Sequence, residues 1–290
     1  MSTFLKTFFV GALSIGLIGG AFATGTLAVV LLPSRPAIPE NTAMVRNVSV
    51  LAKTAILYDV NSSTVLYQKN ANREMPLASL TKLMGAYSVL ASRDGSTVVE
   101  ITPDSIATEG DTGLRAGEAY ELTDLVRLAL VASSNDAAAA VATSLGDDYL
   151  LAMNSAAQHL GLTKTRFLNP TGLDLGPETA GGYGSAYDVA RLAAAFFKAH
   201  PALFEETVHA DVSVSNAGGD LVAAATAAPL RDIPGLIGGK TGFTDLAGGN
   251  LVVAFDLEVG RPVIAVVLGS TREGRFSDIR ALISAARAQL

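Results

Sequence analysis

Strand-like segments at opposite ends of the chain constrain its fold more than any other feature of the sequence. Residues 49–58 and 64–67 form one pair joined by a short polar turn, which is typical of a hairpin. Residues 251–257 and 262–269 form a second, strongly apolar pair joined near a glycine, and they also predict an antiparallel hairpin. We therefore expect one antiparallel sheet built from both chain ends, with a helical subdomain inserted between them.

Helical patterns fill most of the chain between those ends. Apolar side chains follow helical spacing after Ser79, and Ser185 begins a capping-box-like pattern that predicts another helix. Further helices are predicted over 122–132, 136–145, 148–160 and, at the end of the chain, 277–288. The sequence therefore indicates an α/β (α+β) fold with a helical region over about 79–200.

A long apolar stretch precedes this predicted domain. No charged residue lies between Lys6 and Arg35, and about 20 apolar residues are enough to span a bilayer. We expect residues 1–32 to form a signal or membrane-anchor segment, and we favour an uncleaved membrane helix. Ala21 and Ala23 form a small-x-small pattern that also fits cleavage by a signal peptidase, and a buried globular helix is a third alternative.

Prolines mark the boundary between this segment and the folded domain. Pro33, Pro36 and Pro39 lie in a polar stretch, which predicts an extended linker over 33–47. The folded domain is predicted over 48–290. If the first segment is a signal or an anchor, that domain lies outside the cytoplasm.

The composition excludes several classes of function. The net charge is −6 and no basic stripe is evident, so we expect no nucleic-acid partner. The chain has no cysteine, which excludes disulfides, thiol catalysis and thiolate zinc sites. Its three histidines are scattered and lack metal-binding spacing. We therefore expect neither a metal ion nor another cofactor.

Ser79 and Lys82 lie three residues apart at the start of a predicted helix. Positions i and i+3 share one face of a helix, so the hydroxyl and the amine can meet. A serine hydroxyl is a poor nucleophile until a base removes its proton, and a lysine one turn away can be that base. The same spacing also occurs at solvated helix starts, so the interpretation depends on further partners.

Two more motifs supply candidate partners. Ser133-Ser134-Asn135 lies in a predicted break between two helices, where side chains can project into a cleft. Residues 237–244 predict a strand flanked by glycines, which let a ligand backbone approach closely. Each motif is common by itself. The order S-x-x-K, S-x-N, K-T-G is more specific, and this type of set occurs in class A β-lactamases and penicillin-binding proteins.

With these motifs, the segments 75–84, 132–138, 167–173 and 239–244 resemble the low-molecular-mass penicillin-binding proteins that act as serine D-alanyl-D-alanine carboxypeptidases. The resemblance covers about 48–290. It implies a β-lactamase/transpeptidase-like fold and hydrolysis of the terminal D-alanyl-D-alanine bond of peptidoglycan stem peptides. It also implies covalent inhibition by β-lactam antibiotics. Together with the apolar segment over 1–32, it predicts a location at the bacterial cell membrane, with the catalytic domain on the extracytoplasmic side. Secretion after signal cleavage is the alternative.

The resemblance also implies roles for five catalytic residues. Ser79 would attack the carbonyl between the two D-alanines, and Lys82 would take its proton. Lys82 must then be partly neutral near pH 7, and burial together with a cation such as Lys240 lowers a lysine pKa. Ser133 would relay a proton to the leaving amine. Asn135 would fix both Lys82 and the substrate amide.

Substrate binding is implied for a second set of residues: Lys240, Thr241, Gly242, Phe243 and Arg275. Lys240 and Thr241 would hold the terminal carboxylate, and Arg275 would support them. Arg275 also fits a solvated arginine at a helix start. The backbone N–H groups of Ser79 and Phe243 would hold the oxyanion, and preorganised donors of this kind are usually a large catalytic contribution.

Three alternatives stay open on the sequence alone. A class A-like β-lactamase needs a glutamate that activates the deacylating water, and Thr165 stands where that glutamate would be. A D,D-endopeptidase or transpeptidase is harder to separate, because the same acyl-enzyme can pass to an amine instead of water. A catalytically silent peptidoglycan-binding scaffold would keep the fold without the reaction.

Overall fold

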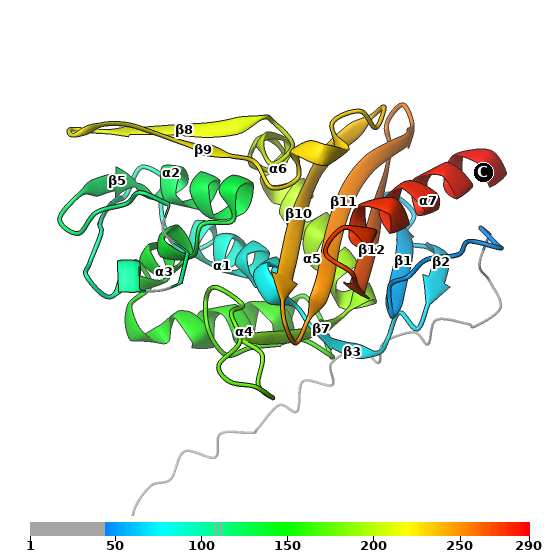
Figure 1. The fold of residues 1–290 in the computed structure, drawn as a ribbon, viewed down its shortest axis with the longest axis horizontal. Helices are drawn as coiled ribbons and strands as arrows, with labels where there is room; N and C mark the ends of the chain where they lie inside the picture. The colour runs from blue at the N-terminus through cyan, green and yellow to red at the C-terminus, as the bar shows by residue number, and fades with distance from the viewer. Residues whose placement is uncertain (1–43, 108, 111) are drawn as a thin grey trace, which may run out of the picture. The chain divides into compact units, whose positions relative to one another are not determined.

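A five-stranded antiparallel sheet joins the two ends of the described chain (Figure 1). In sheet order, its strands are β10 (Leu236–Thr244), β11 (Gly248–Glu258), β12 (Arg261–Ser270), β1 (Thr54–Asp59) and β2 (Val65–Lys69). The two chain ends meet where β1 pairs with β12, with Ile56 opposite Val266. This arrangement confirms the prediction of one antiparallel sheet built from both ends.

The computed structural model describes residues 44–107, 109–110 and 112–290. The predicted signal or anchor segment over 1–32 lies outside the described residues, as does most of the predicted linker over 33–47. Within the described ranges, no helix has both the length and the apolar character needed to cross a bilayer. The structure therefore addresses the predicted catalytic domain.

Strand β1 begins later than predicted, because a buried carboxylate takes the backbone donors before it. The N–H groups of Leu51 and Ala52 donate to the two oxygens of Asp278 at 2.7 and 2.8 Å. The hydroxyl of Ser270 donates to the same carboxylate at 2.7 Å. Asp278 lies on α7 (Gly274–Gln289), so these bonds fasten the C-terminal helix to the segment before β1 and to the end of β12. The strand starts only at Thr54.

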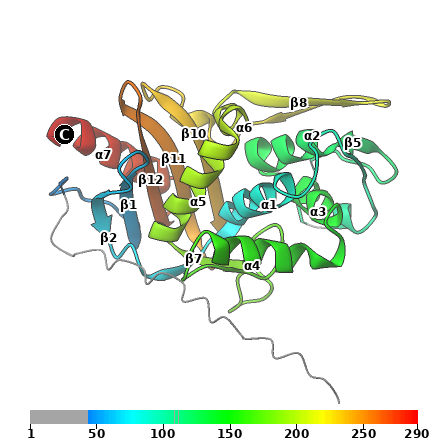
Figure 2. The same ribbon diagram turned by 180° about the vertical axis from the view of Figure 1, so that it is seen from behind.

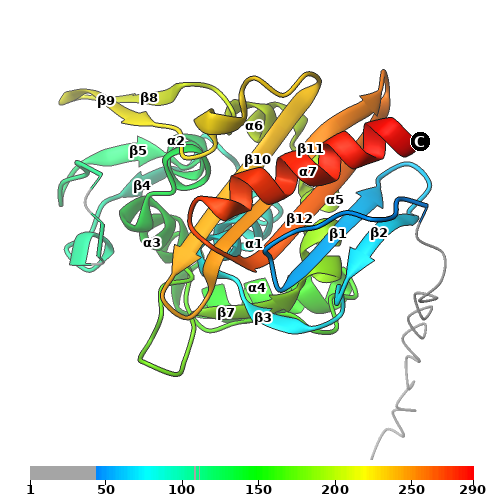
Figure 3. The same cartoon turned by 45° about the vertical axis from the view of Figure 1, so that its right-hand side comes forward.

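The sheet is covered on both faces. Helix α7 lies across one face (Figure 3), where it packs with Val253 and Phe255 of β11. Helix α5 (Ala186–Ala199) and the helical region cover the other face (Figure 2), where Val252 and Ala254 are buried. Neighbouring residues of a strand point to opposite faces. A sheet buried on both sides therefore requires the continuous apolar runs that mark these strands in the sequence.

The helical region confirms the predicted helices, with one change. Its elements are α1 (Thr81–Leu90), α2 (Leu122–Arg127), η3 (Leu128–Ala132), α3 (Asn135–Thr143), α4 (Tyr149–His159), α5 and α6 (Pro201–Glu206). The hydroxyl of Ser185 accepts a hydrogen bond from the Asp188 N–H at 3.1 Å, as the predicted helix cap requires. The helix predicted over 122–132 instead changes to a single π-helical turn, η3, before it ends.

Several short strands were not predicted. β3 (Glu74–Pro76), β7 (Gly182–Ser185) and β6 (Arg166–Phe167) form a small sheet, and β4 (Val98–Glu100) pairs with β5 (Ala119–Glu121). β8 (Asp211–Asn216) and β9 (Gly219–Ala224) form a long hairpin, labelled in Figure 1, that leads back toward β10. The strands other than β8 and β9 have only two to four residues, which gives too little alternation to be recognised from sequence.

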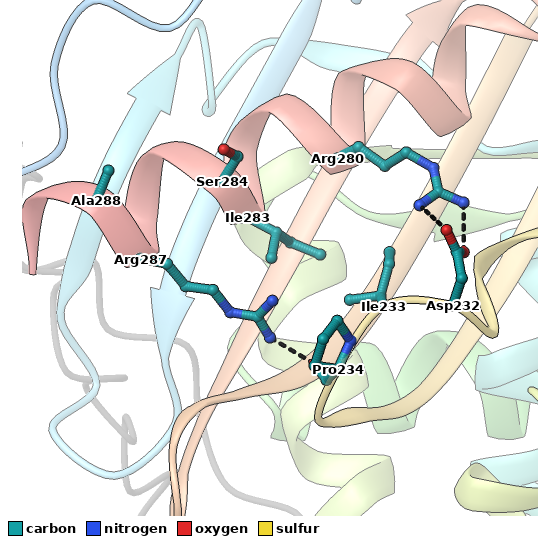
Figure 4. Close-up of a pocket in the computed structure, with 8 residues that line it drawn as sticks. All are labelled: Asp232, Ile233, Pro234, Arg280, Ile283, Ser284, Arg287 and Ala288. Carbon is teal, nitrogen blue, oxygen red and sulfur yellow. Dashed lines mark hydrogen bonds and ion pairs between the residues drawn. The ribbon is translucent and has the colours of Figure 1, made fainter.

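An open groove of about 470 Å³ lies beside α7, between this helix and the loop that precedes β10 (Figure 4). Two arginines border it, and both are engaged within the chain. Arg280 makes two hydrogen bonds with the Asp232 carboxylate, at 2.6 and 2.8 Å, and Arg287 donates to the Pro234 carbonyl. The groove belongs to the α7 face of the sheet, and none of the three sequence motifs contributes to its lining.

Candidate active site

Ser79 lies in a tight turn, η1 (Ala78–Leu80), between β3 and α1. Ala78 has a φ of +49°, which is costly for a residue with a Cβ and requires support from its surroundings. Hydrogen bonds hold the chain just before it: Leu77 N–H donates to the Gly182 carbonyl at 2.9 Å, and the buried Asn250 side chain donates to the Pro76 carbonyl at 2.9 Å. The nucleophile candidate is therefore fixed by contacts to two different sheets.

The Lys82 amine lies against three uncharged oxygen atoms. Its Nζ is 2.7 Å from Ser79 Oγ, 2.7 Å from Asn135 Oδ1 and 2.9 Å from the Thr171 carbonyl oxygen. Only 1% of the Lys82 surface is exposed. Burial without a carboxylate in this contact set disfavours the charged amine, and it lowers the pKa of Lys82 to about 7.

The chemistry of these three oxygens decides where the proton goes. A carbonyl oxygen can only accept, so Asn135 Oδ1 and the Thr171 carbonyl each require an N–H of Lys82. The Asn135 amide is oriented by its other end, because its Nδ2 donates to the Glu109 carbonyl at 2.6 Å. A neutral amine has two N–H bonds and one lone pair, so these two carbonyl oxygens use both of its N–H groups and leave the lone pair free. This lone pair faces Ser79, whose hydroxyl can donate a proton.

Ser133 and Asn135 come from the break between η3 and α3. Ser133 ends the π-helical turn in the left-handed region, with φ 62° and ψ 28°. Ser134 caps α3, because its hydroxyl accepts the Ala137 N–H at 3.0 Å. The Ser134 side chain therefore caps the helix, while the side chains of Ser133 and Asn135 contact the two lysines of the site. Single π-helical turns are frequent at functional sites, and this one ends directly before Ser133.

Lys240 on β10 meets the second motif. Its Nζ donates to Ser133 Oγ at 2.7 Å and to the Thr241 carbonyl at 3.0 Å. Lys240 is fully buried, and its pKa lies well below the usual lysine value, because of burial first and then of the charges of Lys82 and Arg275. A bound anion would stabilise the charged form of Lys240 against burial and against these neighbouring charges. The site is thus arranged to attract a carboxylate.

The end of β10 passes close to the nucleophile turn. A Cβ added to Gly242 would lie 3.0 Å from the Leu77 carbonyl oxygen and 3.2 Å from Ser79 N, so only a glycine allows this approach without displacement. The approach brings the backbone that precedes Phe243 beside that of Ser79. This is the neighbourhood that the predicted oxyanion hole requires.

Arg275 lies at the same end of β10. Its Nη1 donates to the Gly242 carbonyl at 2.7 Å, and its Nε is buried without a hydrogen-bond partner among the described residues. Burial, followed by the nearby Arg272, lowers the pKa of Arg275. Arg272 itself stacks on the Phe243 ring at 3.9 Å. Arg275 is therefore directed at the site and does not extend into solvent.

The structure thus brings the five predicted catalytic residues into two connected groups. Ser79, Lys82 and Asn135 form the first, while Ser133 and Lys240 form the second, and they meet through the second motif. In the described part of the chain, no group of three or more His, Cys, Asp or Glu side chains is arranged to hold a metal ion.

Sequence reasoning missed two contributors to this site. The first is the Thr171 carbonyl, which holds Lys82 but carries no side-chain signal. Asn169 builds its turn by accepting the Gly172 N–H at 2.7 Å and donating to the Leu173 carbonyl at 2.8 Å. The second is Thr226, whose hydroxyl lies 2.7 Å from that of Thr241.

The chain is also similar to known proteins. The sequence pattern of the D-alanyl-D-alanine carboxypeptidase family matches residues 40–272. The chain belongs to this family. D-alanyl-D-alanine carboxypeptidase DacB2 of Mycobacterium tuberculosis is 34% identical over 226 residues, which cover 77% of both chains. A D-alanyl-D-alanine endopeptidase of Escherichia coli is 30% identical over 263 residues, 84% of this chain and 80% of that protein.

A solved structure extends the comparison to the fold. Penicillin-binding protein D2 of Listeria monocytogenes, in its cefotaxime-bound form, superimposes with a TM-score of 0.71 at 29% identity. The match covers 83% of this chain and 99% of that one. The chain spans 41% to 80% of the length of the first four curated relatives that it matches. The predicted transpeptidase-like fold is therefore confirmed for the described domain.

Gly172→Ala should disrupt the site through its backbone. Gly172 has a φ of +81°, and an added Cβ would lie 1.9 Å from the Ala78 carbonyl oxygen. The loop must move away from the nucleophile turn and withdraw the Thr171 carbonyl from Lys82. We expect a loss of about 2–4 kcal/mol in the free energy of unfolding, measured by urea denaturation.

Gly176→Ala is the matched control in the same loop, because a Cβ there meets nothing within 4 Å and its φ is not left-handed. Its stability should stay close to that of the wild type. Equal stability of the Gly172→Ala variant and the wild type would show that the loop is not held against the nucleophile turn.

Proposed function

We propose that this protein hydrolyses the terminal D-alanyl-D-alanine bond of peptidoglycan stem peptides through an acyl-enzyme on Ser79, and so trims the donors of cell-wall cross-links. The observation that carries the proposal is the contact of a buried lysine with the Ser79 hydroxyl at 2.7 Å, in a chain that belongs to the carboxypeptidase family. The remaining residues are assigned to the steps of this reaction.

Acylation begins at the Ser79–Lys82 pair. Ser79 Oγ attacks the carbonyl carbon of the penultimate D-alanine, while its proton passes to the neutral Lys82 amine. The two oxygens that accept from Lys82 become better partners once the amine is charged, so they stabilise the product of the transfer. The negative oxygen of the tetrahedral intermediate is held by the backbone N–H groups of Ser79 and Phe243.

Departure of the last D-alanine requires a proton on its nitrogen. Ser133 Oγ donates this proton to the nitrogen and is reprotonated from the ammonium group of Lys82 or Lys240. The bond between Lys240 Nζ and Ser133 Oγ supports the second source directly. The C–N bond then breaks, and free D-alanine leaves with its amine intact.

A cationic site selects peptides that end in a carboxylate. Lys240, Thr241 and Arg275 supply an ammonium, a hydroxyl and a guanidinium group around the end of β10. The Arg275 Nε lacks a partner within the described chain, and the pKa of Lys240 is depressed, so a carboxylate satisfies one group and stabilises the charge of the other. This arrangement supports hydrolysis at a free chain end.

Deacylation leaves an alternative open, because the acyl group on Ser79 can pass to water or to an amine. The similarity to the Escherichia coli endopeptidase favours endopeptidase action on cross-linked peptides as the second candidate function. A β-lactamase is disfavoured, because Thr165 replaces the expected glutamate and its hydroxyl donates to Asp188 at 3.1 Å. We expect β-lactams to form a long-lived acyl-enzyme. The intact catalytic contacts disfavour a silent scaffold.

The substrate places the reaction outside the cytoplasm. Residues 1–32 would deliver the domain there, either as a retained anchor or as a cleaved signal. A mass measurement of the mature amino terminus separates these two arrangements.

Ser79→Ala should abolish both reactions of the nucleophile. The wild-type domain, incubated with penicillin, should gain the mass of one drug molecule on the peptide that contains Ser79. It should also release D-alanine from a peptide that ends in D-alanyl-D-alanine. The variant should show no adduct, and its release rate should fall by about 1,000-fold or more.

Ser134→Ala serves as the control, because the Ser134 hydroxyl caps α3 and is not among the hydrogen-bond partners of the Lys82 and Lys240 amines in the described chain. It should lose some stability and still be acylated. Absence of both an adduct and D-alanine release in the wild-type protein would refute the proposed function.

The pH dependence should report the protonation of Lys82. Its pKa is lowered to about 7, so the amine is mostly protonated below that pH and cannot accept the Ser79 proton. The value of kcat/KM for D-alanine release should therefore rise with pH through a midpoint of about 7 and then level off. The rate of penicillin acylation should follow the same limb. A profile that is flat over about pH 5.5–8.5 would contradict a lysine base.

A further inference from the structure

Thr226 lies outside the three motifs but contacts two of the segments that carry them. It follows β9, in the turn before the short helix η5 (Ala228–Leu230). The Thr241 hydroxyl donates to the Thr226 hydroxyl at 2.7 Å. The Thr226 backbone N–H donates to the Val131 carbonyl at 3.0 Å, and its hydroxyl points at the same oxygen at 3.4 Å.

Val131 belongs to the π-helical turn η3, which ends two residues later at Ser133. The last carbonyls of a helix have no partner within it and must be satisfied from elsewhere. Thr226 supplies that partner. One residue therefore fastens the segment before Ser133 and, through its side chain, contacts the hydroxyl next to Lys240.

A hydroxyl can donate only one proton, so the direction of the Thr241 hydroxyl matters for substrate binding. Without a ligand it donates to Thr226. When it turns to donate to a carboxylate, its oxygen loses that partner unless Thr226 reverses and donates in return. The backbone N–H of Thr226 donates to the Val131 carbonyl in either arrangement. The Val131 carbonyl therefore still has a hydrogen-bond partner when the Thr226 hydroxyl turns toward Thr241.

We propose that Thr226 is a positioning residue, which orients the Thr241 hydroxyl toward the terminal carboxylate of the substrate while it holds the Ser133 segment in register with β10. This inference rests on the proposed function, because it concerns the same carboxylate. Thr226 itself touches neither the scissile bond nor Ser79 in this assignment. Its effect is on affinity for substrates that carry a free carboxylate.

The test measures binding without the reaction. In a Ser79→Ala background, NMR titration gives the Kd of a peptide that ends in D-alanyl-D-alanine and of the same peptide ending in D-alaninamide. Thr226→Val keeps the shape and removes the hydroxyl. It should raise the Kd of the acid peptide by about 3- to 10-fold, the size expected for one hydrogen bond, and leave that of the amide unchanged. Thr226→Ser should restore the acid affinity.

A double variant separates positioning from general loosening. If Thr226 acts through Thr241, then Thr226→Val should have no further effect in a Thr241→Val protein. In the active enzyme, the same substitution should raise KM for the acid peptide while kcat changes by less than about 2-fold.

Three results would overturn the inference: an unchanged acid Kd in Thr226→Val, an equal loss for acid and amide peptides, or full additivity with Thr241→Val. Failure of the proposed function looks different. In that case the unsubstituted protein releases no D-alanine and the Ser79→Ala protein does not distinguish the acid from the amide.

Discussion

The proposed active site depends on the burial of one amine. Lys82 reaches from α1 into a position where the nucleophile turn, the start of α3 and the turn at 169–173 each present one oxygen. Because these oxygens are uncharged, burial lowers the pKa of Lys82 to about 7 and makes a proton acceptor at physiological pH. A carboxylate at any of the three positions would favour the charged amine and remove the base.

The fold places this amine and a second buried lysine where the sheet meets the helical region. Lys240 comes from the edge strand of the sheet, and Lys82 comes from the helical region. The charge of Lys82 contributes, after burial, to the lowered pKa of Lys240, and each lysine contacts one serine hydroxyl. The sheet built from both chain ends provides a rigid edge, and the inserted helices place the other two motifs against it. The arrangement therefore puts one amine beside the nucleophile and the second beside Ser133 at the proposed carboxylate site.

The sequence could predict the features that depend on residue spacing and local apolar patterns. The spacing of Ser79 and Lys82, the break at Ser133 and the apolar end strands are local patterns with a physical cause. The Thr171 carbonyl and the Thr226 hydroxyl could not be predicted, because their roles arise from tertiary contact and neither residue type is unusual in a turn. The β8–β9 hairpin differs from these contacts, because valine alternates with serine over 212–215, a local pattern that indicates a strand.

The most direct test of this account is the protonation of Lys82 in the free protein. NMR of lysine side chains labelled at Cε, titrated with pH, follows the charge of each amine, and the resonance lost in Lys82→Arg identifies the residue. That resonance should titrate with a midpoint of about 7. A midpoint near 10.5, the ordinary lysine value, would contradict it, because Lys82 would then be charged at neutral pH and unable to activate Ser79.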